Sequence, residues 1–334
     1  MAVNTSFVTK LLFAFILISP LCPAQEQTNE FIDLANREIR LENYHAAFIF
    51  LDSAFALSPG NAEIPMIKAD IYKKQSNFRM AIGSYDDAIN INPGYHQAYY
   101  ERSVLRYTVG DHRDYALQDI NKAISMQSSN THYLIHKARI LRNTINPSTE
   151  LPDLPEAIAL LSEAIQIAPD SSRFLDIRGQ VKFESGQTLA ALSDFTKAIE
   201  MEQVAVYFGD RGLTYLVIED YQSAIQDFTS AVELDPLNED YIQRRGHAKF
   251  NTGKYNDAID DFTLAINTLF RKISLIPGKI DQNHPLNKSL QENYLFRGSA
   301  LLQVEATYEA CNDFKAAREL GNRKAYNYVR RYCK

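Results

Sequence analysis

Two histidines four residues apart come nearest to metal chemistry in this chain. His132 and His136 would lie on one face of a helix, where such a pair can supply two of the ligands that zinc requires. No Glu lies between them as in zinc proteases, and the spacing offers no third ligand. The sequence also contains no Cys-x-x-Cys pair, phosphate-binding glycine loop or nucleophile elbow. We therefore expect two solvent-facing or groove-facing histidines, no cofactor and no enzymatic activity.

Cys311 and Cys333 are the other pair that could do chemistry. Two buried thiols are one interpretation, because free cysteines are common in helical cores. A disulfide is the other, and the expected geometry favours it. Gly321 should end one helix, and a final capping helix over 322–334 should fold back, so that both cysteines lie ten or eleven residues from the turn. Antiparallel neighbours at equal distances from a turn face each other, and an oxidising compartment would close the bond.

A recurring spacing of small, aromatic and proline residues extends over most of the sequence. The first set is Tyr44, Ala47, Leu51, Ala54 and Pro59. Its first alanine returns after steps of 34, 35, 41, 34, 33, 34 and 52 residues. A fixed period of this size predicts one supersecondary unit stacked many times. The alanines are Ala47, Ala81, Ala116, Ala157, Ala191, Ala224, Ala258 and Ala310.

A second small residue precedes most of these alanines by twelve positions, as Gly212 precedes Ala224. Antiparallel helices cross closely only where neither carries a bulky side chain, so each repeat is predicted to be a helix pair. In its period and its small, aromatic and proline positions, the chain resembles the tetratricopeptide repeats over about residues 28–321. The tryptophan common in the first helix of that family is absent. The resemblance implies an all-α, right-handed superhelix that acts through protein–protein interaction.

The spacing divides a solenoid over 25–321 into eight helix pairs with two interruptions. A proline-rich loop is expected at 145–155, inside the fourth pair. An insertion at 273–290 precedes the eighth pair, and we expect the helix before it to continue to about Leu275. This insertion could contact a partner or be a tolerated surface extension. The pairs are 28–61, 62–95, 96–130, 131–171, 172–204, 205–238, 239–272 and 291–321.

The first two dozen residues have the layout of a secretory signal peptide. Lys10 precedes the apolar run LLFAFILI, which is followed by SPLCPA. We expect a signal peptide over 1–24, cleavage after Ala24, and an exported chain that is periplasmic or secreted. An alternative is a lipoprotein modified at Cys22, although the large Leu21 precedes that cysteine. No other stretch approaches the roughly 20 apolar residues of a membrane span.

The composition restricts the partners. The formal net charge is −6, and an acidic surface opposes binding to nucleic acid or to anionic lipid. Hydrophobic residues make up 46% of the chain, which is too many for a disordered protein. We therefore expect a protein or peptide partner.

Charged residues also follow the repeat. A basic residue precedes the small residue of most first helices, and an aspartate precedes the aromatic residue of several second helices. The arginines could bind an acidic ligand. The alternative, which we favour, is ion pairing between neighbouring repeats, such as Asp194 with Arg211 and Asp227 with Arg245.

The resemblance to tetratricopeptide repeats implies a partner-binding groove lined by the first helices. The version that clamps acidic chaperone tails uses Lys, Asn and Arg, and the matching positions here are Met66, Asp70, Tyr100 and Val104. That clamp is not supported, and a mixed aromatic and aliphatic groove suits an amphipathic or extended segment instead. The residues assigned to the groove are Tyr100, Val104, Tyr107, Arg139, Arg142, Phe183, Leu213, Leu216, His247 and Phe250.

Two other functions compete with a non-catalytic scaffold or adaptor. One is an accessory or targeting subunit of a cell-envelope enzyme or assembly complex. A catalytic module of its own would have to fit in 145–155 or 273–290, and neither segment is long enough for a domain. The other is a purely structural spacer, which a uniformly charged groove would have favoured.

Overall fold

The structure is a computed structural model that describes residues 24–110, 113–278, 280–281 and 283–333. These residues form 17 α-helices and no strand, which confirms the predicted all-α fold. The expected signal peptide, apart from Ala24, and the alternative lipid site at Cys22 lie outside the described residues. The chain divides into two compact units, Met1–Pro152 and Asp153–Lys334.

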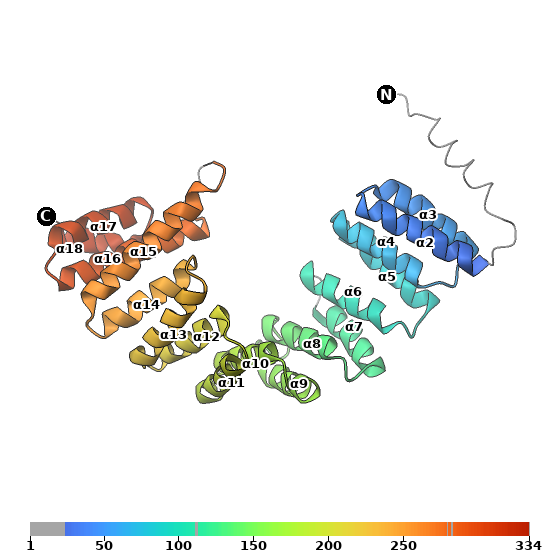
Figure 1. The fold of residues 1–334 in the computed structure, drawn as a ribbon, viewed down its shortest axis with the longest axis horizontal. Coiled ribbons are helices and arrows are strands. Elements are labelled where there is room, and N and C mark those ends of the chain that lie inside the picture. Colours follow the sequence, from blue (N-terminus) through green and yellow to red (C-terminus); the bar gives the residue numbers. More distant parts are fainter. Residues whose placement is uncertain (1–23, 111–112, 279, 282, 334) are drawn as a thin grey trace, which may run out of the picture. The chain divides into compact units, whose positions relative to one another are not determined.

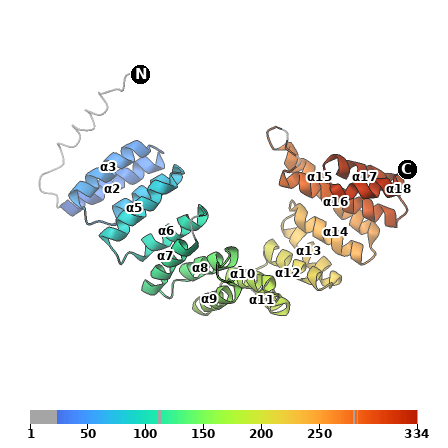
Figure 2. The same ribbon diagram turned by 180° about the vertical axis from the view of Figure 1, so that it is seen from behind.

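The described part of the first unit contains seven helices, and each packs against the next one along the chain. Figure 1 shows them stacked in sequence order, and Figure 2 shows the same stack from behind. The helices are α2 (Ala24–Arg40), α3 (Tyr44–Leu57), α4 (Glu63–Lys74), α5 (Phe78–Ile91), α6 (His96–Thr108), α7 (Arg113–Met126) and α8 (Thr131–Asn143).

The second unit is built in the same way from ten helices. First helices of successive repeats also touch one another, as α12 touches α14 and α14 touches α16. The helices are α9 (Leu154–Ile167), α10 (Ser172–Glu184), α11 (Thr188–Met201), α12 (Ala205–Val217), α13 (Tyr221–Leu234), α14 (Glu239–Asn251), α15 (Tyr255–Ser274), α16 (Pro285–Gln303), α17 (Thr307–Glu319) and α18 (Arg323–Tyr332).

Helix α13 shows how the repeat residues produce a helix. The Asp220 side chain caps its start by accepting a hydrogen bond from the Ser223 backbone N–H at 3.2 Å. Ala224, Phe228 and Ala231 follow at helical spacing, and each is fully buried. Pro236 lies two residues beyond the last helical residue. One face of α13 is therefore apolar and packs into the stack.

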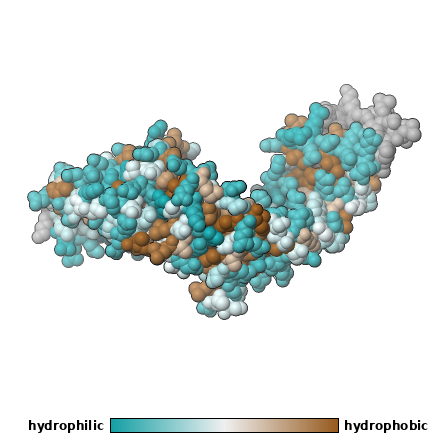
Figure 3. Space-filling view, turned by 60° about the horizontal axis from the view of Figure 1, so that its bottom comes forward, coloured by the Kyte–Doolittle hydropathy of each residue, from teal (hydrophilic) through white to brown (hydrophobic). Residues whose placement is uncertain are grey.

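Glycines allow the two helices of a repeat to cross closely. A Cβ atom added to Gly179 would lie 2.7 Å from the Phe195 ring, and one added to Gly298 would lie 2.7 Å from the Phe314 ring. Both rings are almost completely buried. The aromatic residue thus occupies the space that the glycine leaves free. By contrast, the molecular surface in Figure 3 is mainly hydrophilic, with separate hydrophobic patches.

The two interruptions differ in structure. Residues 144–153 separate α8 from α9, where the proline-rich loop was expected. The segment 273–290 is helical at both ends, because α15 ends at Ser274 and α16 begins at Pro285. Leu290 is buried against Ile266 and Leu269 of α15, so part of this insertion belongs to the core.

The last helix, α18, covers the end of the eighth pair. Ala325 is fully buried, and Tyr328 packs on Phe314 with ring centroids 4.7 Å apart. A disulfide joins Cys311 in α17 to Cys333, with their Cα atoms 5.4 Å apart. The final helix is therefore held both by apolar contacts and by a covalent bond.

The two ion pairs predicted between repeats are wrong, because each of these aspartates pairs with the arginine of its own repeat. Asp227 accepts hydrogen bonds from Arg211 Nε at 2.8 Å and Nη2 at 2.7 Å, and not from Arg245. Asp194 likewise binds Arg178 and not Arg211. In each of these two repeats a glycine meets an aromatic ring where the two helices cross. The arginine immediately precedes this glycine in the sequence, and the aspartate immediately precedes the aromatic residue. The two charged residues are therefore brought together by the same contact.

Several of these arginines use the remaining guanidinium nitrogen, Nη1, to donate a hydrogen bond to the neighbouring repeat. Arg211 Nη1 donates to Thr196 Oγ1 of the preceding second helix at 3.1 Å, and Arg297 Nη1 donates to Thr263 Oγ1 at the same distance. These guanidinium groups have only small exposed fractions. The arginines are thus used inside the stack, and an arginine ladder for an acidic ligand is not supported.

Candidate partner-binding groove

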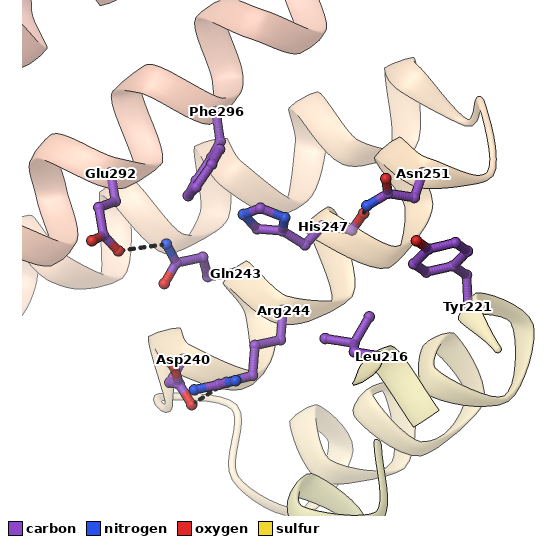
Figure 4. Close-up of a pocket in the computed structure, with 9 residues that line it drawn as sticks. All are labelled: Leu216, Tyr221, Asp240, Gln243, Arg244, His247, Asn251, Glu292 and Phe296. Carbon is purple, nitrogen blue, oxygen red and sulfur yellow. Dashed lines mark hydrogen bonds and ion pairs between the residues drawn. The ribbon is translucent and has the colours of Figure 1, made fainter. Parts of the chain in front are cut away.

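First helices of the second unit line an open cavity of about 420 Å³. Its walls come from α12, α14 and α16, with one residue from the start of α13. The close-up in Figure 4 shows both apolar and polar side chains facing the cavity. The lining residues are Leu216, Tyr221, Asp240, Gln243, Arg244, His247, Asn251, Glu292 and Phe296.

Aromatic rings form one wall of the cavity. His247 meets Phe296 edge-on, with centroids 3.9 Å apart, and its ring also meets the buried Phe262 at 5.9 Å. Burial, followed by the charge of Arg244, lowers the pKa of His247 below its usual value. His247 is therefore neutral at pH 7 and acts as an aromatic surface.

Polar side chains at the edge of the cavity are tied to one another only weakly. Arg244 Nε donates to Asp240 Oδ2 at 2.7 Å, but both side chains are at least one-third exposed, so this pair contributes little to stability. Gln243 Nε2 reaches Glu292 Oε2 at 3.5 Å. These groups can exchange such contacts for hydrogen bonds to a partner at small cost.

The first unit has a smaller cavity on its first helices. It measures about 370 Å³ and lies between α2 and α4. Lys73 Nζ, which lines this cavity, lies 2.9 Å from Asp70 and 3.1 Å from Glu101. The lining residues are Asn36, Ile39, Ile67, Asp70, Lys73 and Lys74.

The two histidines considered as metal ligands have different surroundings. His132 is exposed, as expected, whereas His136 is buried and hydrogen-bonded to Ser103 Oγ at 3.0 Å. Burial, followed by the charge of Arg139, lowers the pKa of His136 to about 4. The expectation that His136 faces solvent or the groove is therefore wrong, because its ring fills the contact between α6 and α8. No cluster of three metal-ligating side chains occurs in the part of the chain that the structure describes.

Comparison with known proteins gives partial sequence matches. No protein-family model matches the chain. Tetratricopeptide repeat protein 13 from Homo sapiens is 30% identical over 110 residues, which cover 33% of this chain and 13% of that protein. DnaJ homolog subfamily C member 3 from Rattus norvegicus is 22% identical over 302 residues, which cover 83% of this chain and 57% of that protein. The chain thus spans less than two thirds of either relative.

A solved structure is matched over nearly all of its own length. The C-terminal part of a TPR repeat-containing protein from Cytophaga hutchinsonii superposes with a TM-score of 0.61 at 17% identity. The match covers 78% of this chain and 98% of that one. The chain has the tetratricopeptide-repeat fold.

Two predicted groove residues of this tetratricopeptide-repeat chain, Leu216 and His247, line the larger cavity. Leu213 packs with Leu216 against the buried core of α13 and α14. Phe250 meets the Tyr255 ring at 5.3 Å, and Phe183 is half-buried on α10. These four residues and His247 all lie on first helices, but they do not form one cavity.

The other predicted groove residues belong to the first unit. The Tyr100 and Tyr107 rings meet His136 at 5.6 and 5.9 Å, so both pack against α8. Asn143 Nδ2 also donates to the Tyr107 hydroxyl at 2.9 Å. Arg139 is exposed, whereas Val104 and Arg142 are half-buried. In this unit, much of the predicted groove surface is used to hold helices together.

Sequence reasoning missed Phe296, which forms the aromatic wall of the cavity. It lies two positions before Gly298, just as Arg244 lies two positions before Gly246. That shared offset was a signal that could have found both residues. Asp240 lies six positions before Gly246, and Glu292 lies six positions before Gly298. Both residues line the cavity, so this second shared offset is also a sequence signal for it.

No described helix is both long and apolar enough to cross a membrane.

Proposed function

We propose that this chain is an exported, non-catalytic adaptor that binds a protein or peptide partner on the first helices of residues 153–334. The observation that carries the proposal is the cavity between α12, α14 and α16. Its volume of about 420 Å³ is in the range of ligand pockets, and it combines aromatic walls with a few polar groups. Tetratricopeptide-repeat proteins bind their partners in a groove lined by the first helices, and the position of this cavity on first helices agrees with that mode.

The cavity suits a side chain of an extended or amphipathic segment. An aliphatic or aromatic side chain can pack against Phe296 and the neutral His247. The partner backbone then lies near Gln243 and Asn251, whose side-chain amides donate and accept hydrogen bonds. Such a mixture of an apolar anchor and backbone contacts is a common mode of peptide recognition.

Binding experiments on cavity variants test this proposal. Segments captured from a random peptide display library should bind the wild-type chain, and Leu216→Ser should weaken that binding at least about tenfold by removing apolar contact. Phe296→Ser should weaken it further. Because Phe296 also packs near Phe262 at 5.8 Å, circular dichroism and the melting midpoint must accompany that variant.

Leu189→Ser is the matched control. Leu189 lies on the second helix α11 and is 78% exposed, so its loss removes a comparable apolar side chain outside the cavity. Its peptide affinity should equal that of the wild type. Equal losses in the cavity and control variants, or no loss in Leu216→Ser, would contradict binding at this cavity.

Export has a separate test, because the residues that motivate it precede the described helices. The intact mass of protein secreted or released from the periplasm of a bacterial host should correspond to a chain that begins at Gln25. A chain that retains Met1 in the cytoplasm would contradict export. A lipid adduct on Cys22 would support the lipoprotein alternative.

A further inference from the structure

The outward face of α18 carries only cations and neutral residues. Arg323, Lys324, Arg330 and Arg331 are exposed, and the helix contains no acidic residue. Within the described residues none of these four cations takes part in an ion pair. Tyr326, which is 57% exposed, lies between the two cation pairs. This is a concentrated positive surface on a chain whose formal net charge is −6.

The rest of the cap holds this face in place. The opposite side of α18 packs on α17 through Ala325, Tyr328 and Val329. The Asn322 side chain caps the helix by accepting hydrogen bonds from the backbone N–H groups of residues 324 and 325, at 3.0 and 3.2 Å. The Cys311–Cys333 disulfide anchors its end. The cations are therefore presented on a rigid surface, and the apolar side of α18 is not available to insert elsewhere.

Solubility does not explain a face with charges of one sign. A terminal helix of a repeat stack needs a polar outer surface, but charges of both signs meet that need. Helix α2, the first described helix of the chain, has Glu26, Glu30 and Asp33 together with Arg37 and Arg40.

Two of the four α18 cations also lie at a locally unfavourable end of the helix. Arg323 and Lys324 occupy its first turn, where the helix dipole disfavours positive charge. Clustered like charges repel one another as well. Four exposed cations that form no ion pair among the described residues, two of them at the unfavourable end of the helix, point to an external anion.

We propose that the cationic face of α18 docks the chain on the anionic phospholipid headgroups of a bilayer surface. This inference rests on the proposed export, which would place the chain next to an envelope membrane. Tyr326 suits the headgroup region, where amphipathic aromatic side chains are favoured. The cap lies on the bilayer and does not span it.

The acidic remainder of the chain does not prevent this contact. At physiological salt the Debye length is about 8 Å, so charges on distant repeats are largely screened at the bilayer surface. Residues 307–333 contain six basic and three acidic residues, and one of those acids, Asp313, is already bound by Arg297. The local charge therefore decides the interaction.

Vesicle co-sedimentation tests the inference with the purified exported chain. Binding should be strong to vesicles in which about a third of the lipid is phosphatidylglycerol, weak to pure phosphatidylcholine, and reduced by added salt. Each basic residue near an anionic surface contributes about fivefold in partitioning, so Arg330→Gln with Arg331→Gln should weaken binding about 25-fold. The exported form that begins at Gln25 is used for every protein compared, so the apolar residues before it do not contribute to vesicle binding.

Arg37→Gln with Arg40→Gln is the matched control, since it removes two basic residues from α2. It should change vesicle binding less than about twofold. Equal binding to neutral and anionic vesicles, unchanged binding by the α18 variant, or tighter binding of a single-stranded oligonucleotide than of anionic vesicles would each overturn the inference. Peptide binding at the α12–α14–α16 cavity should be the same in all these proteins. If peptides bind but anionic vesicles do not, the lipid inference fails and the proposed adaptor function stands.

Discussion

Replacing Arg211 with Met should destabilise the chain more than the same change at Arg245. Both arginines hold a buried aspartate with two hydrogen bonds. Asp261, the partner of Arg245, also lies 2.8 Å from Lys249 Nζ and would keep one cation. Among the described residues Asp227 has no such second cation, because Tyr215 occupies the position on α12 that matches Lys249 on α14.

The expected costs follow from burial. Arg211→Met leaves the Asp227 carboxylate, which is 4% exposed, without its cation, and such a loss costs about 3–5 kcal/mol. Arg245→Met removes hydrogen bonds to a charge that stays paired, which costs about 1.5–3 kcal/mol. Arg244→Met breaks the exposed pair with Asp240 and should cost less than about 1 kcal/mol.

Urea unfolding followed by circular dichroism measures these differences. Hydrogen exchange should accompany it, because repeats of a solenoid can open locally. The loss of protection in Arg211→Met should centre on α12 and α13. Equal costs for Arg211→Met and Arg245→Met, or a cost below about 1 kcal/mol for the former, would refute the argument that the buried carboxylate decides the energetics.

Three other perturbations have expected outcomes. Because the pKa of His136 is lowered to about 4, the unfolded chain binds a proton at this residue before the folded chain does as the pH falls from 6.5. The stability that this residue contributes is complete above pH 6.5 and should decrease by up to about 3 kcal/mol by pH 4. Chemical denaturation should show a weaker pH dependence of stability in His136→Gln but not in His132→Gln. Gly179→Ala places a Cβ 2.7 Å from a buried ring and should cost about 1–3 kcal/mol in urea unfolding, whereas Gly83→Ala, in open space within α5, should gain about 0.5–1 kcal/mol. Cys333→Ser opens a disulfide with a sequence separation of 22 and should lower hydrogen-exchange protection of α17 and α18 by on the order of 3 kcal/mol, with little change elsewhere; two free thiols in the native protein would contradict the bond.

The sequence by itself determined the helix pairs and the small and aromatic residues that meet where the two helices cross. The spacing of Ala224, Phe228 and Ala231 specifies one face of a helix, because the height and direction of a side chain on a helix follow from its position. The small residue at Gly212 then identifies where the partner helix crosses. The same local reasoning placed α15 correctly to within a residue of its observed end at Ser274.

The cavity could be predicted only in part. Leu216 and His247 follow from their positions on first helices, and both line it. The offset of Phe296 from Gly298 indicates a first-helix position as well, but its contact with His247 depends on how closely α16 approaches α14. His136 was similarly misjudged, since its burial depends on the neighbouring α6 and not on its own helix.

Only the tertiary structure decided which charges pair. In the sequence, Arg211 is 17 residues from Asp194 and 16 from Asp227, so separation does not distinguish between them. The crossing of α12 with α13 selects Asp227, because the contact between Gly212 and Phe228 aligns the preceding residues. Helix periodicity is a local property of the chain, whereas ion-pair partners depend on the distance between helices, which packing sets.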